Sequence, residues 1–172
     1  VLKDVMPHCK GQNRIAFFDL SDCSKRTDEY ILEMLSLLKE FGNYANVILS
    51  LNRNETNCIS KVLLGNSTTD FETQGKHLFE QLNVDVLLLH SSKKATAYFT
   101  SGKGEAESFY ISNPAFSTGA GDNFNAGFIA AQLMGLEPES SLVVANAAAA
   151  IHMQTGNSAD IESIVQFLES TN

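Results

Sequence analysis

The residues between Thr118 and Asp122 are of types that could do chemistry on a phosphate group. This stretch, Thr-Gly-Ala-Gly-Asp, follows a β-like run (residues 107–112) and precedes an apolar, helix-like run (residues 124–134). Glycines let the backbone turn tightly and bring main-chain N–H groups close to a ligand. The first N–H groups of a helix lack intrahelical partners and lie at the positive end of the helix dipole. The spacing therefore predicts an anion site, most naturally for phosphate.

Asp122 falls in the first turn of this expected helix and allows two interpretations. A carboxylate at the start of a helix is stabilised by the helix dipole and needs no further role. A carboxylate beside a phosphate site can instead act as a general base, taking the proton from a hydroxyl that attacks the phosphate. The spacing alone favours neither interpretation.

The pattern Thr-Gly-Ala-Gly-Asp followed by x-Phe-x-Ala-Gly-Phe resembles the C-terminal signature of the PfkB (ribokinase-like) family of sugar and nucleoside kinases. The resemblance implies that Asp122 is the catalytic base. It also implies that the N–H groups of Gly119, Ala120 and Gly121 form the anion hole for the transferred phosphoryl group. Thr118 would lie among the residues that bind the nucleotide. The cofactors implied are ATP and Mg²⁺, and the substrate implied is a sugar or a nucleoside.

The tetrad from Asn52 to Glu55 follows an expected strand and resembles a second motif of the family. In the family this motif acts through the magnesium ion and its water shell near the phosphates. Carboxylate and amide oxygens suit Mg²⁺, which keeps several of its waters. Asn and Glu at a strand-to-helix junction are also common as helix caps. A competing register, Asn54 to Asn57, would lose the carboxylate, so Asn52 and Glu55 are preferred.

Three further residues are candidates for nucleotide binding. Asn146 lies in an alanine-rich run that resembles the family helix beside the adenine base, and the resemblance implies that Asn146 contacts the purine. Close helix packing would explain the alanines but not Asn146. Gly156 begins a turn that resembles the loop after this helix. Ser91 follows an expected strand and could reach a phosphate, the alternative being a solvated loop.

Departures from the family pattern support a second hypothesis, a non-catalytic PfkB-like module that binds a ligand or dimerises. Ser92 and Ala95 stand at the glycine positions of the family's Gly-x-x-Gly loop. Phe116 stands where the family often has aspartate, which argues against a monovalent-cation site. A dinucleotide-binding dehydrogenase is disfavoured, because Gly119-Ala-Gly121 comes late in the chain and lacks that motif's third glycine.

Strands and helices are expected to alternate along the chain. Short apolar runs predict buried strands, and apolar residues at helical spacing predict helices. We expect strands over residues 14–20, 45–51, 84–90, 95–100 and 107–112, and helices over residues 28–41, 56–64, 70–82, 124–134, 140–153 and 161–168. The last two strands should form a hairpin around a glycine turn at residues 101–104. This order predicts an α/β fold with a largely parallel sheet and helices on both faces, and the resemblance implies a ribokinase-like core.

The composition limits the classes of partner. A length of 172 residues fits a single domain over residues 1–172. The net charge of −8 and the lack of a basic stripe argue against a nucleic-acid partner. The sequence shows no membrane-spanning apolar run and no signal peptide at its start. Its three widely spaced cysteines fit neither zinc spacing nor a disulfide framework, so a cytoplasmic protein is expected.

The resemblance covers the chain from about residue 14 onward and implies the C-terminal, ATP-binding and catalytic portion of a longer kinase. The N-terminal part, with the lid and much of the sugar pocket, would then lie outside this segment. The identity of the acceptor is therefore left open, and the isolated segment need not be active. A homodimer is also left open, since dimers of the family often use the lid.

Overall fold

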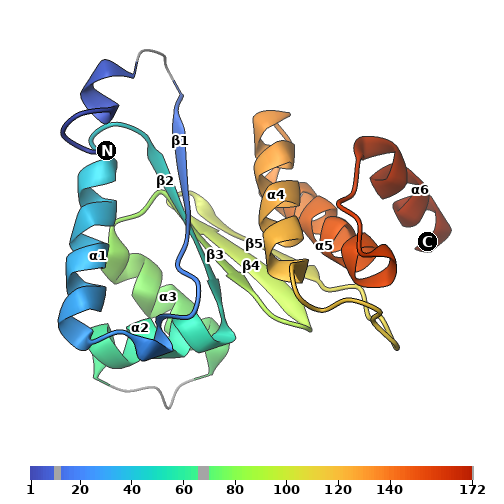
Figure 1. The fold of residues 1–172 in the computed structure, drawn as a ribbon, viewed down its shortest axis with the longest axis horizontal. Helices are drawn as coiled ribbons and strands as arrows, with labels where there is room; N and C mark the ends of the chain where they lie inside the picture. Colours follow the sequence, from blue (N-terminus) through green and yellow to red (C-terminus); the bar gives the residue numbers. More distant parts are fainter. Residues whose placement is uncertain (10–12, 66–69, 172) are drawn as a thin grey trace. The chain divides into compact units, whose positions relative to one another are not determined.

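A computed structural model describes residues 1–9, 13–65 and 70–171 of the chain (Figure 1). It contains five strands, β1 (Ile15–Asp19), β2 (Asn46–Asn52), β3 (Val86–His90), β4 (Lys94–Phe99) and β5 (Gly102–Glu107). Its α-helices are α1 (Asp28–Phe41), α2 (Arg53–Leu64), α3 (Phe71–Leu82), α4 (Ala120–Leu133), α5 (Pro138–Thr155) and α6 (Ile161–Thr171). The strands form one sheet in the order β1-β2-β3-β4-β5. The chain divides into two compact units: unit 1 is Val1–His90 with Tyr98–Gly102, and unit 2 is Ser91–Ala97 with Lys103–Asn172.

The first three strands are parallel, as the sequence predicts. Strand β1 pairs with β2, with Asp19 opposite Ser50, and β2 pairs with β3, with Asn52 opposite His90. Residues 47–51 of β2 are all buried, which is the burial pattern of a central parallel strand. The carboxyl ends of the three strands therefore lie along one edge of the sheet, where open α/β sheets usually bind their ligands.

The core of unit 1 lies between one face of these strands and helices α1, α2 and α3 (Figure 1). It is built by alternate residues of β2 and β3, by residues of the three helices, by Val84 before β3 and by Tyr98 of β4: Ile31, Leu35, Leu38, Val47, Leu49, Leu51, Ile59, Leu78, Leu82, Val84, Leu87, Leu89 and Tyr98. Each such side chain contributes about 1.5–3 kcal/mol when fully buried. Gly75 of α3 belongs to this packing, because a Cβ there would lie 2.3 Å from Leu89 Cδ1. A glycine inside a helix lowers the stability of the helix, and the close contact with the sheet at Gly75 offsets this loss.

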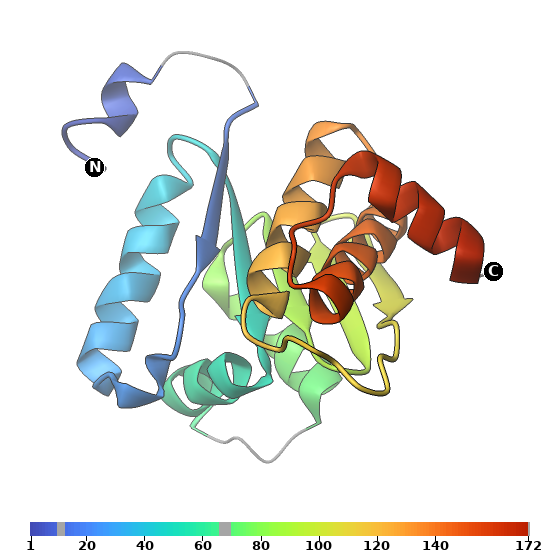
Figure 2. The ribbon, with the colours of Figure 1, turned by 45° about the vertical axis from the view of Figure 1, so that its right-hand side comes forward.

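In unit 2, α4 packs closely against α5 (Figure 2). A Cβ on Gly127 would lie 2.9 Å from the Cβ of Ala148 and 3.0 Å from the Cα of Ala145. The small residues of α4 therefore allow a close approach to the next helix. Helix α6 packs on α5, and its Phe167 meets Phe109 edge-on, with ring centroids 5.0 Å apart.

The prediction of a strand over residues 107–112 is wrong. Strand β5 comes earlier, and the hairpin between β4 and β5 turns at residues 100–101 instead of 101–104. The apolar residues after β5 have other roles: Phe109 packs on α6, and Tyr110 is 86% exposed. Strand β5 itself has the sequence Gly-Lys-Gly-Glu-Ala-Glu, which has low strand propensity.

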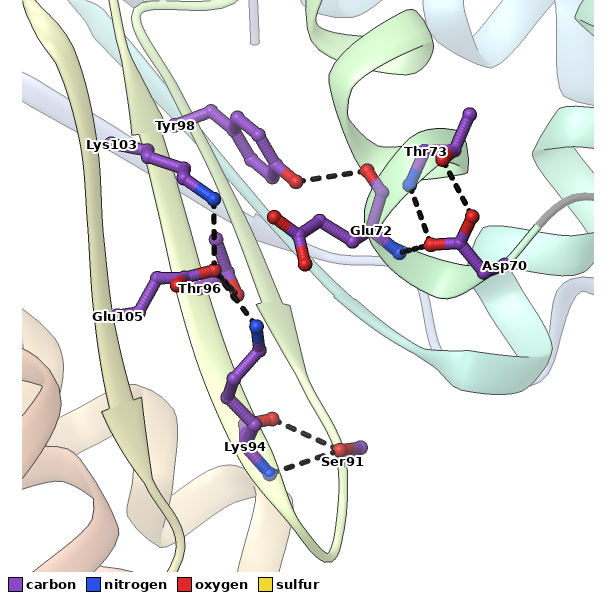
Figure 3. Close-up of polar contacts among 9 residues, drawn as sticks. All are labelled: Asp70, Glu72, Thr73, Ser91, Lys94, Thr96, Tyr98, Lys103 and Glu105. Carbon is purple, nitrogen blue, oxygen red and sulfur yellow. Dashed lines mark hydrogen bonds and ion pairs between the residues drawn. The ribbon is translucent and has the colours of Figure 1, made fainter.

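A charged cluster explains how such a sequence pairs as a strand. Glu105 Oε1 lies 2.9 Å from Lys94 Nζ of β4 and 3.2 Å from Lys103 Nζ (Figure 3). The hydroxyl of Thr96 donates to the same oxygen at 3.4 Å. Strand β5 is an edge strand, and charged side chains are common at such edges. Opposite charges on neighbouring strands stabilise the pairing by about 0.2–1 kcal/mol.

Among the helices that the structure describes, none combines the length and the apolar character that a membrane span requires. The three cysteines are free thiols, with Cys9 exposed, Cys58 half-buried and Cys23 buried. Burial raises the pKa of the Cys23 thiol to about 12, and the neighbouring thiol of Cys58 adds to the shift.

Candidate active site

The glycine turn, defined here as residues 118–121, lies at the start of α4. Gly119 is the N-cap of this helix and has φ of 90°, a left-handed conformation that favours glycine. No side chain of the described residues caps the helix. The N–H of Gly119 has no hydrogen-bond acceptor among the described residues, and the Ala120 N–H makes only a long contact of 3.4 Å with Ser117 O. The turn thus presents main-chain donors at the positive end of a helix, as an anion site requires.

Asp122 lies in the first turn of α4, as predicted, and it is exposed. Among the described residues it makes no ion pair and no side-chain hydrogen bond. Its carboxylate is therefore accessible to an approaching hydroxyl group. Stabilisation of the helix start by the same carboxylate is equally compatible with this position, so its role as a base stays a prediction.

The end of α5 holds the segment that leads into the glycine turn. The N–H groups of Ala115 and Phe116 both donate to Met153 O, at 2.9 and 3.1 Å. His152 Nε2 lies 2.8 Å from Thr118 O. Gly156 caps α5 with φ of 75°, and a Cβ there would lie 2.8 Å from the Phe116 ring. The predicted residues Thr118 and Gly156 therefore both lie where the end of α5 contacts the segment before α4.

Asn52 and Glu55 form a reciprocal capping box at the start of α2. The N–H of Glu55 donates to Asn52 Oδ1 at 3.0 Å, and the N–H of Asn52 donates to Glu55 Oε2 at 2.8 Å. This is the helix-cap alternative noted for the tetrad. It leaves Glu55 Oε1 outside the box, so the predicted contact with hydrated Mg²⁺ stays a prediction.

Glu55 belongs to an acidic environment at the carboxyl end of β1. Glu55 is only 4% exposed, and burial raises the pKa of its carboxyl group, although the N–H of Asn52 opposes the shift. The negative charges of Asp19 and Asp22 raise the pKa further. Burial also lowers the pKa of His90 at the end of β3, an effect that Asp19 opposes. A cation would relieve the repulsion among these carboxylates.

The described residues contain no group of three or more His, Cys, Asp or Glu side chains that could hold a metal ion by themselves. The carboxylate oxygens of Glu55 and its acidic neighbours are nevertheless ligands of the type that Mg²⁺ prefers. A magnesium ion here would keep water ligands or share phosphate oxygens, which is its usual behaviour in proteins.

The side chains of Ser91 and Asn146 make contacts within unit 2. Ser91 Oγ donates to Lys94 O at 2.9 Å and accepts from the N–H groups of Lys93 and Lys94, so it closes the tight turn between β3 and β4. Asn146 is 5% exposed, and its Nδ2 donates to Glu107 O at 3.0 Å. Ser108 Oγ lies 3.4 Å from Asn146 Oδ1. The predicted contacts of both side chains with nucleotide stay predictions.

His152 and Asn123, which both contact the glycine turn, were not among the residues predicted from the sequence. Asn123 Nδ2 donates to Gly119 O at 2.9 Å. His152 is separated from Thr118 by 34 positions, and only the folded chain brings the two together. Asn123 could have been found from the sequence, because an amide side chain four residues after a helix N-cap can reach the N-cap carbonyl.

The sequence of residues 2–171 matches the family described as prokaryotic ketohexokinase. The chain belongs to this family. Prokaryotic ketohexokinase is a PfkB-type family, so the resemblance recognised from the glycine motif is confirmed. A ketohexokinase of Haloferax volcanii is 26% identical over 155 residues, which cover 90% of this chain and 41% of that protein.

Solved structures confirm the ribokinase-like α/β fold of this ketohexokinase-family chain. A ribokinase of Thermotoga maritima matches with a TM-score of 0.71 and 22% identity over 95% of this chain and 51% of its own. An Arabidopsis thaliana ribokinase complexed with ribose and ATP matches with a TM-score of 0.62 and 22% identity, over 83% of this chain and 53% of its own. The chain thus spans about half the length of these relatives.

Proposed function

We propose that this chain carries the phosphoryl-transfer site of a carbohydrate kinase, which moves the γ-phosphoryl group of ATP to a hydroxyl of a ketohexose or a related sugar. Membership of the prokaryotic ketohexokinase family supports the reaction class. The observation that carries the proposal is the glycine turn, where the Gly119 N–H, which has no acceptor among the described residues, and the start of α4 lie next to the exposed Asp122.

In the proposed reaction, the N–H groups of Gly119, Ala120 and Gly121 would donate to the oxygens of the transferred phosphoryl group. Such donors are aligned before the reaction begins, and each can contribute ~3 kcal/mol to transition-state stabilisation by analogy with acyl-transfer sites. Asp122 would take the proton of the attacking hydroxyl. The carboxylate is accessible in the first turn of the same helix, so one element would orient both the base and the donors.

ATP with Mg²⁺ is the proposed cofactor, and ATP is present in the structure of the Arabidopsis relative. When bound, Mg²⁺ neutralises charge on the phosphates and orients them for in-line transfer. On this chain, Glu55 would hold the hydrated ion, and Asn52 would fix the Glu55 side chain through the capping box. The charges of Asp19 and Asp22 would favour the cation in that region.

The alternative is a non-catalytic PfkB-like module, and specific contacts favour it. The side chains of Asn52, Ser91 and Asn146, which the resemblance assigns to magnesium and nucleotide, are each engaged in hydrogen bonds within their own unit. A module of this kind would bind a ligand weakly or not at all at the nucleotide site, and it would transfer no phosphate.

A calorimetric titration of the complete polypeptide with ATP, with and without Mg²⁺, followed by an assay of ADP release, separates the two hypotheses. The assay would compare a ketohexose, an aldopentose and a nucleoside as acceptors. We expect Mg²⁺-dependent ATP binding and ADP release that requires a sugar. ATP binding without ADP release from any acceptor, or no ATP binding, would favour the non-catalytic module.

A further inference from the structure

The glycine turn is held by hydrogen bonds to two of its successive carbonyl groups. Thr118 O lies 2.8 Å from His152 Nε2, and Gly119 O accepts from the main-chain N–H of Asn123 at 3.0 Å and from its Nδ2 at 2.9 Å. In a trans peptide the C=O and the N–H of the same plane point in opposite directions. A bond to Thr118 O therefore sets the direction of the Gly119 N–H, and the bonds to Gly119 O set that of the Ala120 N–H.

The two peptide planes differ in what holds them. The main-chain bond from Asn123 to Gly119 O is the first i to i−4 bond of α4, so the helix itself orients the Ala120 N–H. The plane between Thr118 and Gly119 lies outside the helix. Among the described residues, His152 makes the one side-chain hydrogen bond to this plane.

The geometry around the imidazole ring shows that it is closely fitted to the turn. A carbonyl oxygen only accepts hydrogen bonds, so His152 Nε2 must carry the hydrogen and donate it. A Cβ on Gly119 would lie 2.9 Å from Nε2, which is too close for any residue but glycine, and 3.3 Å from Cε1. Nδ1 is buried and has no hydrogen-bond partner within the described residues, so the ring's polar contact is directed at the turn.

We propose that His152 is a positioning residue of the anion site, which holds the peptide between Thr118 and Gly119 so that the Gly119 N–H points toward the transferred phosphoryl group. His152 does not touch the substrate. Its role rests on the proposed phosphoryl-transfer function. The end of α5 is in this way coupled to the start of α4 through one hydrogen bond.

Two substitutions distinguish positioning from simple packing. His152→Ala removes the donor, whereas His152→Gln keeps an N–H at a comparable distance along the side chain. Gln154→Ala is a matched control, because this exposed side chain lies in the same last turn of α5. Urea unfolding of each variant would show whether a loss of activity comes from a loss of folded protein.

The first readout is the turnover of ATP with the best sugar acceptor. We expect His152→Ala to lower kcat roughly ten- to hundredfold, less than the loss on deleting an anion-hole donor, with the KM for the sugar nearly unchanged. His152→Gln should recover most of kcat, and Gln154→Ala should match the unsubstituted protein. A kcat for His152→Ala close to the unsubstituted value, or no recovery with Gln at equal stability, would overturn the proposal.

The second readout does not depend on activity. Inorganic phosphate would be titrated into each protein while the amide NMR signals of Gly119, Ala120 and Gly121 are followed. We expect phosphate to bind the unsubstituted protein and the Gln variant with similar affinity and the Ala variant about tenfold more weakly. Turnover that is absent while phosphate binding follows this order would refute the kinase function but support the role of His152. Equal phosphate affinity in all variants, or no binding to the unsubstituted protein, would refute that role.

Discussion

Replacing Gly119 by alanine tests the geometry of the glycine turn most sharply. An L residue at its φ of 90° is strained by about 1–2 kcal/mol, and the added Cβ would lie 2.9 Å from His152 Nε2. Overpacking of this kind costs about 1–3 kcal/mol, because either the ring or the turn must move. We therefore expect Gly119→Ala to lower the free energy of unfolding by about 2–5 kcal/mol, the sum of the two effects.

Gly135→Ala is the matched control. Gly135 follows the other end of α4 and has φ of 78°, but a Cβ there meets no atom of the described residues within 4 Å. This variant should lose only the backbone part, about 1–2 kcal/mol. Urea unfolding measures both losses. In a His152→Ala background the cost of Gly119→Ala should fall to that of Gly135→Ala, because the contacts couple the two sites. Equal costs for both glycines in the unsubstituted background would contradict the proposed contact.

Three further predictions concern charge, thiol access and cation dependence. Burial raises the pKa of Glu55, so the folded state binds the proton of this carboxyl group more tightly than the unfolded state does. The free energy of unfolding should therefore fall as the pH rises from the ordinary pKa of glutamate through the raised pKa of Glu55, and Glu55→Gln should flatten this fall in urea titrations at several pH values. Cys9 is exposed and Cys23 is buried, with its thiol pKa raised to about 12; mass spectrometry after brief alkylation should find Cys9 modified first and Cys23 unmodified until urea unfolds the protein. Phe116 stands at the position where the family often has aspartate, and its ring packs on Gly156. We therefore expect no monovalent-cation site, so the rate of ADP release should be the same in K⁺ and in a bulky organic cation. A strict requirement for K⁺ would count against this interpretation.

The parallel part of the fold was predictable because its signals are strong. Continuous apolar runs such as the one in β2 occur in strands buried on both faces, and helices α1 and α3 show their stripes of buried residues in the sequence. Strand β5 was not predictable, because glycine and charged residues have low strand propensity and the cross-strand contacts of Glu105 become visible only in the folded chain. The apolar residues after β5 have the composition of a strand, but Phe109 packs on α6 instead.

The candidate site was predictable to the extent that its residues are close in sequence. The glycine turn and Asp122 form one motif, so their common location at the start of α4 followed from local spacing. His152 could not be found in this way, because its contact with Thr118 joins two segments 34 positions apart. Asn52 and Glu55 show a further limit of sequence analysis. The same two residue types at this spacing form a capping box and resemble a magnesium motif, and the spacing alone does not separate the two roles.

The most direct test of the account is the turnover of an Asp122→Asn variant. Glu139→Gln is its control, because it removes an exposed carboxylate from the first turn of another helix, α5. If Asp122 is the general base, kcat should fall by about 10²–10⁴ while calorimetry finds the affinity for ATP with Mg²⁺ unchanged, and the control should keep its activity. Turnover equal to that of the unsubstituted protein would show that another group removes the proton, and the assignment of this site would be wrong.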